Sequence, residues 1–279
     1  MEYLHQAQER FKEQYGAVGH DVHRLIEKSV PHALPIVYSS TRTISLSEDV
    51  MRAHRLITGY EGGAFVDAYK MLRAQIMQQF RQKGWNVLGV SSSRAHEGKT
   101  LTAVNLSLAL AMDLAHTVLL VDADMAHPSV HRAFGMETAH GLSEYLFDDA
   151  PLSHLLVHPG IDRLIFLPGG RAVKQSAEAL ASPRMAALAR ELKHRYPSRF
   201  IVFDLPPLLS RVDALGFTPY IDALLLVAEE GRTSSTEIEQ AVTAIEGSVP
   251  ILGGILNKSG RKLNSRRQAA ELLQTPTSK

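Results

Sequence analysis

The stretch that decides the fold reads Val87-Leu88-Gly89-Val90-Ser91-Ser92-Ser93-Arg94-Ala95-His96-Glu97-Gly98-Lys99-Thr100. An apolar run at 87–90 leads into a short polar loop, and residues 101–111 then form an Ala- and Leu-rich run typical of a helix. This order predicts a strand, a phosphate-binding loop and a helix. In such a loop, glycine lets backbone N–H groups approach an anion and the helix N-terminus adds partial positive charge. Lys99 reaches the outer phosphates, and the Thr100 hydroxyl ligates Mg²⁺.

The loop departs in one place from the consensus G-x-x-x-x-G-K-[ST], because Ser93 stands where the first glycine belongs. A bare G-K-T occurs often by chance, and the alternative is an ordinary structural turn. The strand before it and the helix after it favour phosphate binding. The residues expected to contact a nucleotide here are Arg94, Ala95, His96, Glu97, Gly98, Lys99, Thr100 and Leu101.

Composition bounds the class of protein. The 279 residues are 45% apolar and 21% charged, with a net charge of +1, which is ordinary for a globular protein with a full core. The near-neutral charge predicts no nucleic-acid partner, and the locally basic stretch at 258–267 is interpreted as a solvated tail. The absence of cysteine excludes disulfides and thiol catalysis. No apolar run approaches the ~18 residues of a membrane span, so we expect a cytoplasmic location.

Three segments are expected along the chain. Residues 1–63 form an N-terminal helical and extended arm, residues 64–258 a nucleotide-binding domain, and residues 259–279 a basic tail. Gly59, Gly62 and Gly63 mark the first boundary. A helix with one apolar face is expected directly after it, from residue 65 to about 83.

Two further apolar runs end in carboxylates. Residues 117–122 end at Asp122, with Asp124 two positions on, and residues 200–204 end at Asp204. Continuous apolar runs suit strands that are covered on both faces of a parallel sheet. Shorter apolar runs at 164–167, 223–228 and 251–256 alternate with helical stretches. This alternation predicts an α/β fold with a doubly wound, mainly parallel sheet.

Carboxylates beside a phosphate loop can take part in proton transfer and in metal binding. One of Asp122 and Asp124 would position a nucleophile or accept its proton, and the other would hold Mg²⁺ or its waters. Asp204, at the end of a buried strand, has the Walker B arrangement that holds the metal. The alternative for each aspartate is capping of the following helix. Asn257, after the last expected strand, is placed at the rim where a nucleotide base could lie.

The ordered set of motifs resembles the bacterial polysaccharide-biosynthesis tyrosine autokinases, whose P-loop fold is shared with the partitioning ATPases. The similarity covers residues 65–258 and is greatest to the free-standing proteins of exopolysaccharide gene clusters. The stretches at 167–170 and 178–184 are similar to family segments that the partitioning ATPases lack. The three motifs are Glu97-Gly98-Lys99-Thr100, Leu119-Leu120-Val121-Asp122-Ala123-Asp124-Met125 and Val202-Phe203-Asp204-Leu205-Pro206-Pro207.

The resemblance implies a role for each residue of these motifs. It implies ATP and Mg²⁺ as cofactors, with Asp122 as the base that activates the incoming hydroxyl. Asp124 and Asp204 would organise Mg²⁺ together with Thr100, and Lys99 would stabilise charge on the transferred phosphoryl group. Lys99, Asp122 and Asp124 are therefore the expected catalytic residues.

The resemblance also implies partners. The family's E-x-x-R-x-x-R helix, which packs against a neighbour in a ring, appears here as Asp67, Lys70 and Arg73. Charge is kept at all three positions, although lysine lacks the guanidinium fork. A homo-oligomer is therefore expected, together with a membrane polysaccharide chain-length or export protein that recruits the chain to the inner face of the membrane.

Three departures from the family pattern bear on function. Ala126 stands where the family has arginine, and Arg94 falls on the signature lysine of the partitioning ATPases. The last tyrosine is Tyr220, so the C-terminal tyrosine cluster that such kinases phosphorylate is missing. Three functions stay open: a tyrosine kinase whose acceptor is Tyr3, Tyr15 or a partner protein, a nucleotide-gated ATPase switch of the same export machinery, and a partitioning-type ATPase.

Overall fold

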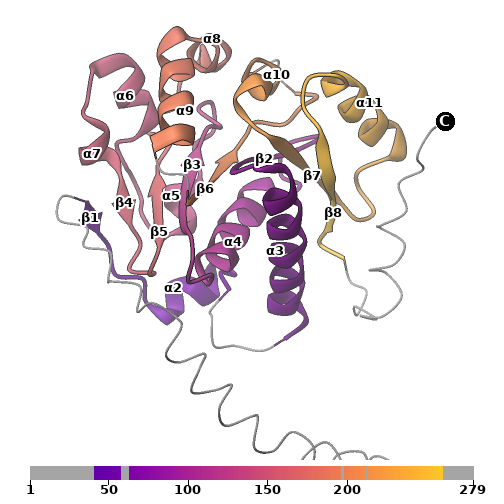
Figure 1. Ribbon diagram of the computed structural model, residues 1–279, viewed down its shortest axis with the longest axis horizontal. Coiled ribbons are helices and arrows are strands. Elements are labelled where there is room, and N and C mark those ends of the chain that lie inside the picture. The colour runs from indigo at the N-terminus through magenta and orange to yellow at the C-terminus, as the bar shows by residue number, and fades with distance from the viewer. Residues whose placement is uncertain (1–40, 58–62, 196–197, 211–212, 260–279) are drawn as a thin grey trace, which may run out of the picture. The chain divides into compact units, whose positions relative to one another are not determined.

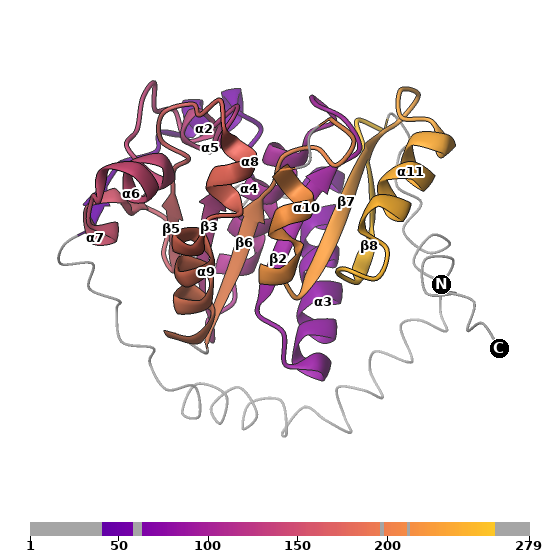
Figure 2. The same ribbon diagram turned by 90° about the horizontal axis from the view of Figure 1, so that it is seen from above.

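The computed structural model describes residues 41–57, 63–195, 198–210 and 213–259. Within them the strands form one sheet of order β1-β4-β5-β3-β6-β2-β7-β8, in which every neighbouring pair is parallel except β4 and β5. Figure 2 shows this order across the view from β5 to β8. The strands are β1 (Arg42–Thr43), β2 (Val87–Ser92), β3 (Thr117–Asp122), β4 (Val157–His158), β5 (Leu164–Leu167), β6 (Arg199–Asp204), β7 (Ala223–Glu229) and β8 (Ile251–Asn257).

Helices cover both faces of this sheet (Figure 1), which confirms the doubly wound, mainly parallel fold. Alternate strand residues supply the two cores, since successive side chains of a strand point to opposite faces. Leu88 of β2 packs in one core with α3 and α4, whereas Val87 packs in the other with α9 and α11. The helices are α2 (Glu48–Ala53), α3 (Ala64–Lys83), α4 (Lys99–Ala111), α5 (Val130–Ala133), α6 (Leu142–Asp148), α7 (Leu152–Leu155), α8 (Ser176–Leu180), α9 (Pro183–Arg195), α10 (Asp213–Phe217) and α11 (Ser235–Ile245), with a 3₁₀ turn at Thr218–Tyr220.

Residues assigned by sequence to the N-terminal arm contribute to the sheet and its core. β1 pairs with β4, and Ile57 is buried against the sheet. The backbone N–H of Ile57 donates to Asn105 Oδ1 of α4 at 2.8 Å, and Asn105 Nδ2 donates to the carbonyl of Arg55 at 3.0 Å. Residues within 42–57, which the sequence assigned to the N-terminal arm, thus belong to the sheet and its core. The helices expected within 1–29 and the tail at 260–279 lie outside the described residues.

The sheet topology brings three motifs to one edge. β2, β3 and β6 are adjacent and parallel, so their carboxyl ends meet at the same edge. Asp204 lies in register with Val90 of β2 and with Asp122 of β3. The phosphate loop leaves β2 two residues beyond Val90. This register is what places the loop and the two strand-end aspartates in one site.

Across the described residues, no helix combines the length and the hydropathy that crossing a bilayer requires.

Candidate active site

The phosphate loop enters α4 through a left-handed glycine. Gly98 is the N-cap residue of α4 with φ 96°, in the region that side chains disfavour. A Cβ built on Gly98 would lie 1.9 Å from Asn257 Nδ2, because the Asn257 amide donates to the Glu97 carbonyl at 2.9 Å. His96 also has positive φ, at 69°. The loop thus needs glycine at 98 for its backbone conformation and for the approach of β8.

Gly98→Ala is expected to disturb this loop. The added methyl group must displace the Asn257 side chain, and the alanine must adopt a strained φ. Such backbone strain costs on the order of 1–3 kcal/mol. We expect a lower free energy of unfolding and weaker MgATP binding, measured by denaturant titration and by equilibrium binding. Gly231→Ala is the matched control, since Gly231 also has positive φ but has open space around its Cβ position. If both variants bound MgATP like the wild type, the loop geometry would not matter for binding.

Lys99 lies buried among carboxylates at the start of α4. Its Nζ is 2.8 Å from Asp124 Oδ2 and 3.4 Å from Asp204 Oδ1. Burial alone would lower the pKa of the ammonium group, but attraction to Asp204 and Asp124 outweighs it, so the pKa of Lys99 is raised. Lys99 therefore stays charged, and the surrounding aspartates hold it in place.

Asp122 is fully buried at the end of β3. Its Oδ2 accepts the backbone N–H groups of Ser129 at 2.7 Å and Val130 at 2.9 Å. Its Oδ1 has no hydrogen-bond partner among the described residues. Burial is the largest cause and repulsion by Asp204 the second, and together they raise the pKa of Asp122 to about 7. The two N–H donors and Lys99 act in the opposite direction. A carboxyl group with this pKa and one unpartnered oxygen suits a general base near neutral pH.

The glycine loop after β5 lies against Asp122. A Cβ on Gly169 would be 3.2 Å from Asp122 Cγ and 2.8 Å from Pro128 Cβ. From the sequence, Gly169 is notable only as part of a stretch similar to a family segment, and its closeness to Asp122 was not foreseen. The sequence around Gly169 gives no signal of which side chain this glycine faces.

Thr100 and Asp204 complete an oxygen-rich set. The Thr100 hydroxyl donates to Asp204 Oδ2 at 2.6 Å. Burial raises the pKa of Asp204, and Lys99 and the Thr100 hydroxyl act against that rise. Asp124 is also buried, and its Oδ1 accepts the N–H of His127 at 3.3 Å. A hydroxyl and carboxylates are hard oxygen donors of the kind that Mg²⁺ prefers.

These donors fit Mg²⁺ held jointly with phosphates better than a metal held by protein alone. In the part of the chain that the structure describes, no group of three or more His, Asp or Glu side chains is placed to hold a metal ion. Mg²⁺ is usually bound by one or two carboxylates together with substrate phosphates. Thr100, Asp124 and Asp204 are the residues that could hold Mg²⁺ in such a set, and Asp122 Oδ1 beside them has no hydrogen-bond partner among the described residues.

A buried glutamate ties the phosphate loop to the segment before α11. Glu97 is 1% exposed, and its Oε2 accepts the backbone N–H of Arg94 at 2.9 Å. Its Oε1 accepts the hydroxyl of Thr233, whose Oγ1 in turn accepts the N–H of Glu229 at 2.8 Å. Thr233 was not foreseen from sequence, because it is 136 positions from Glu97 and belongs to no motif. The loop is thus tied, through Thr233, to the segment between β7 and α11.

Several residues expected to contact the nucleotide are exposed or have other partners in the described structure. The Arg94 guanidinium is 64% exposed and pairs with Glu237 of α11. Ala95 and His96 are exposed, and the His96 carbonyl accepts Lys258 Nζ at 2.9 Å. Leu101, in the first turn of α4, packs against the core. Asn257 contacts the backbone of the loop, through Glu97, in the described structure.

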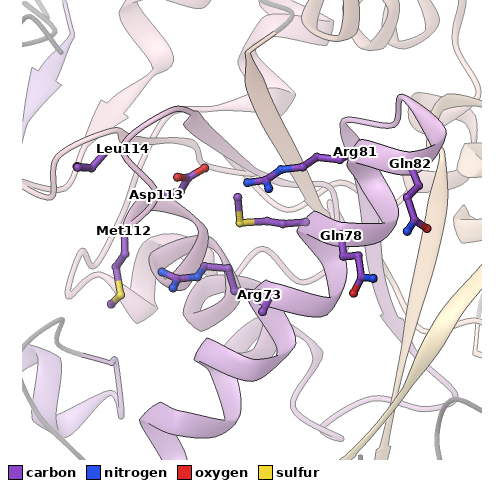
Figure 3. Close-up of a pocket in the computed structure, with 9 residues that line it drawn as sticks. Arg73, Gln78, Arg81, Gln82, Met112, Asp113 and Leu114 are labelled. Carbon is purple, nitrogen blue, oxygen red and sulfur yellow. The ribbon is translucent and has the colours of Figure 1, made fainter. Parts of the chain in front are cut away.

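Arg73, the last of the three charged residues expected to act together on α3, contacts the C-terminal end of α4. Arg73 Nη1 donates to the carbonyl of Ala109 at 3.1 Å, near the C-terminus of α4. Asp67 is exposed and Lys70 is half-buried. Arg73 and Arg81 line a groove with Asp113 (Figure 3). Because α4 has 13 residues and is about 20 Å long, this groove is well separated from Lys99.

Comparison with known proteins decides the family. No protein-family model matches the chain. The tyrosine-protein kinase YwqD of Bacillus subtilis is 31% identical over 206 residues, which are 72% of this chain and 84% of YwqD. The chain belongs to the bacterial tyrosine-protein kinases. The succinoglycan biosynthesis transport protein ExoP of Rhizobium meliloti is 30% identical over 214 residues, 75% of this chain but only 27% of ExoP.

Solved structures agree with this family. The kinase domain of the Escherichia coli tyrosine kinase ETK has a TM-score of 0.65 at 26% identity, covering 83% of this chain and 92% of that domain. The septum site-determining protein MinD of Pyrococcus horikoshii, solved with Mg-ADP, has a TM-score of 0.54 at 23% identity over 68% of this chain and 78% of MinD. The MinD likeness shows the fold alone. The family expected from the motifs is confirmed, and this bacterial tyrosine-protein kinase is an enzyme of phosphoryl transfer.

Proposed function

We propose that this bacterial tyrosine kinase transfers the γ-phosphoryl group of ATP to tyrosine and thereby regulates exopolysaccharide synthesis or export. The observation that carries the proposal is the buried Asp122, with one unpartnered oxygen and a pKa of about 7, beside the buried Lys99. The name of ExoP, a transport protein of succinoglycan biosynthesis, supports the polysaccharide role.

In the proposed reaction, Lys99 exchanges its contacts with Asp124 and Asp204 for oxygens of the β- and γ-phosphates. Bound Mg²⁺ would neutralise charge on the phosphates, held by Thr100 and the two aspartates. Asp122 accepts the phenol proton of the acceptor tyrosine. The phenol oxygen forms a bond to the γ-phosphorus, the bond from that phosphorus to the bridging oxygen breaks, and ADP leaves.

A second candidate is an ATPase switch of the same machinery that lacks kinase activity. The distribution of tyrosines supports this second candidate, because no tyrosine follows Tyr220. Tyr69 is buried, and burial raises its pKa, so it is a poor acceptor as it stands. The expected acceptors Tyr3 and Tyr15 lie outside the described residues.

The experiment that separates the two candidates follows labelled γ-phosphate. Purified protein is incubated with Mg²⁺, labelled ATP and a tyrosine-containing synthetic polypeptide, and the label is divided into phosphotyrosine and free phosphate. Label on tyrosine supports the kinase. Free phosphate without phosphotyrosine supports the ATPase switch and contradicts kinase activity toward this acceptor.

We further propose self-association through α3 and recruitment to the membrane by a polysaccharide chain-length or export protein. Asp67 is exposed and Lys70 half-buried, so both are accessible to a neighbouring copy. Arg73 has a bond within its own chain, to Ala109. The cytoplasmic location at the inner face of the membrane belongs to this same proposal.

Substitutions on α3 are expected to separate self-association from stability. Lys70→Ala should weaken self-association, measured as a lower sedimentation coefficient over a concentration series. Arg73→Ala should in addition lower the free energy of unfolding by about 0.5–1.5 kcal/mol, because the Ala109 carbonyl loses a donor. Gln75→Ala, at an exposed position of the same helix, is the control. Sedimentation of Lys70→Ala identical to the wild type would contradict an interface at this position.

A further inference from the structure

The hydroxyl of the serine before α5 does not cap its helix. Ser129 is the N-cap residue of α5, where serine normally accepts a backbone N–H. Its side chain makes no such bond. Asp122 Oδ2 instead accepts the N–H groups of Ser129 and Val130, at 2.7 and 2.9 Å. The hydroxyl of Ser129 lies 3.1 Å from Thr100 Oγ1.

The direction of this bond follows from counting protons. A threonine hydroxyl has one proton and two lone pairs. Thr100 donates its proton to Asp204 Oδ2 at 2.6 Å, so Ser129 must be the donor to Thr100. One lone pair of Thr100 is then occupied by Ser129. The other is approached by Lys99 Nζ at 3.3 Å. Ser129 and Asp204 together fix the rotation of the Thr100 hydroxyl.

We propose that Ser129 is a positioning residue for Mg²⁺ in the kinase reaction. It holds the Thr100 hydroxyl so that one lone pair stays available for a cation once Lys99 has moved to the phosphates. Its backbone N–H holds Asp122, so one residue supports both the metal ligand and the proton acceptor. The inference rests on the proposed function, and it deepens that function by adding a residue outside the expected site set.

The test measures metal binding without turnover. Mn²⁺ replaces Mg²⁺, and free Mn²⁺ is followed by electron paramagnetic resonance in a titration of the full chain with ATP. We expect Ser129→Ala to weaken Mn²⁺ affinity about 10–100-fold, the usual effect of losing an outer-shell partner of a metal ligand. ATP binding in the presence of a chelator should be unchanged, and Ser129→Thr, which keeps the hydroxyl, should restore Mn²⁺ affinity.

A second serine provides the matched control. Ser47, the N-cap residue of α2, does cap its helix, since its Oγ accepts the N–H of Val50 at 3.3 Å. Ser47→Ala should therefore lower the thermal midpoint and leave Mn²⁺ affinity unchanged. Ser129→Ala should leave the thermal midpoint unchanged and weaken Mn²⁺ affinity, because Asp122 already accepts the N–H groups at the start of α5.

Two outcomes would overturn the inference, and they are distinguishable. If the wild type binds Mn²⁺ with ATP and Ser129→Ala binds it equally well, Ser129 has no positioning role, although the proposed function stands. If the wild type binds neither ATP nor Mn²⁺, the proposed function fails and the inference fails with it.

Discussion

Lys99→Met is expected to abolish measurable MgATP binding and to lower phosphoryl transfer by at least about 10²–10³-fold, the usual effect of removing one group that stabilises developing charge. The substitution keeps the length of the side chain and removes its charge. It also leaves Asp124 and Asp204 buried without their cation. We therefore expect a loss of about 3–5 kcal/mol in the free energy of unfolding at neutral pH, as for other broken buried ion pairs.

The binding result must be separated from this loss of stability. MgATP affinity is measured by calorimetry at a temperature where circular dichroism shows the variant to be folded. Lys83→Met is the matched control, because Lys83 is exposed at the end of α3 and should bind MgATP like the wild type. A folded Lys99→Met protein with wild-type MgATP affinity would contradict the claim that this loop binds the phosphates of ATP.

Asp122→Asn is expected to separate chemistry from binding. The asparagine oxygen can still accept the N–H groups of Ser129 and Val130, so the fold around α5 should persist. The amide cannot accept the phenol proton, so transfer to tyrosine should fall about 10²–10⁴-fold, the range for a lost general base. MgATP affinity should change little, because Lys99, Thr100 and Asp204 remain. Loss of affinity as large as the loss of transfer would contradict a role specific to the chemical step.

The pH dependence of the same residue gives an independent measurement. A base must be deprotonated to act, so kcat/KM of the wild type should rise with pH through about 7, the pKa of Asp122. The free energy of unfolding should instead fall as pH rises over this range. The folded pKa is raised above the unfolded value of 3.8, so the stabilising contribution is full below pH 3.8 and is lost as pH rises through 7. Asp122→Asn should flatten this part of the stability curve.

The parts of the site that follow from local chemistry could be predicted from the sequence. The stretch from Val87 to Thr100 is a strand, a loop and the start of a helix, as its composition indicates. Asp122 and Asp204 end buried apolar strands, and the parallel register places them side by side. Both inferences need only local periodicity and the rule that strand ends share an edge.

The remaining features depend on contacts between segments that are distant in the sequence. Glu97 meets Thr233 across 136 positions, and no spacing rule points to that partner. Ser129 could be expected only as a helix cap, and its hydroxyl turns to Thr100 because Asp122 already accepts the N–H groups at the start of α5. β1 and β4 have two residues each, too few to show a strand period. Such details need the folded chain.

The most direct test of the central claim is phosphotyrosine formation by the intact chain, on itself or on an added acceptor. Wild-type protein and Lys99→Met are incubated separately with ATP, Mg²⁺ and a tyrosine-containing synthetic polypeptide, and phosphorylated peptides from each incubation are mapped by mass spectrometry. The account predicts phosphotyrosine in the wild type and none in Lys99→Met. Free phosphate production without any phosphotyrosine in the wild type, or equal phosphotyrosine in both proteins, would contradict it.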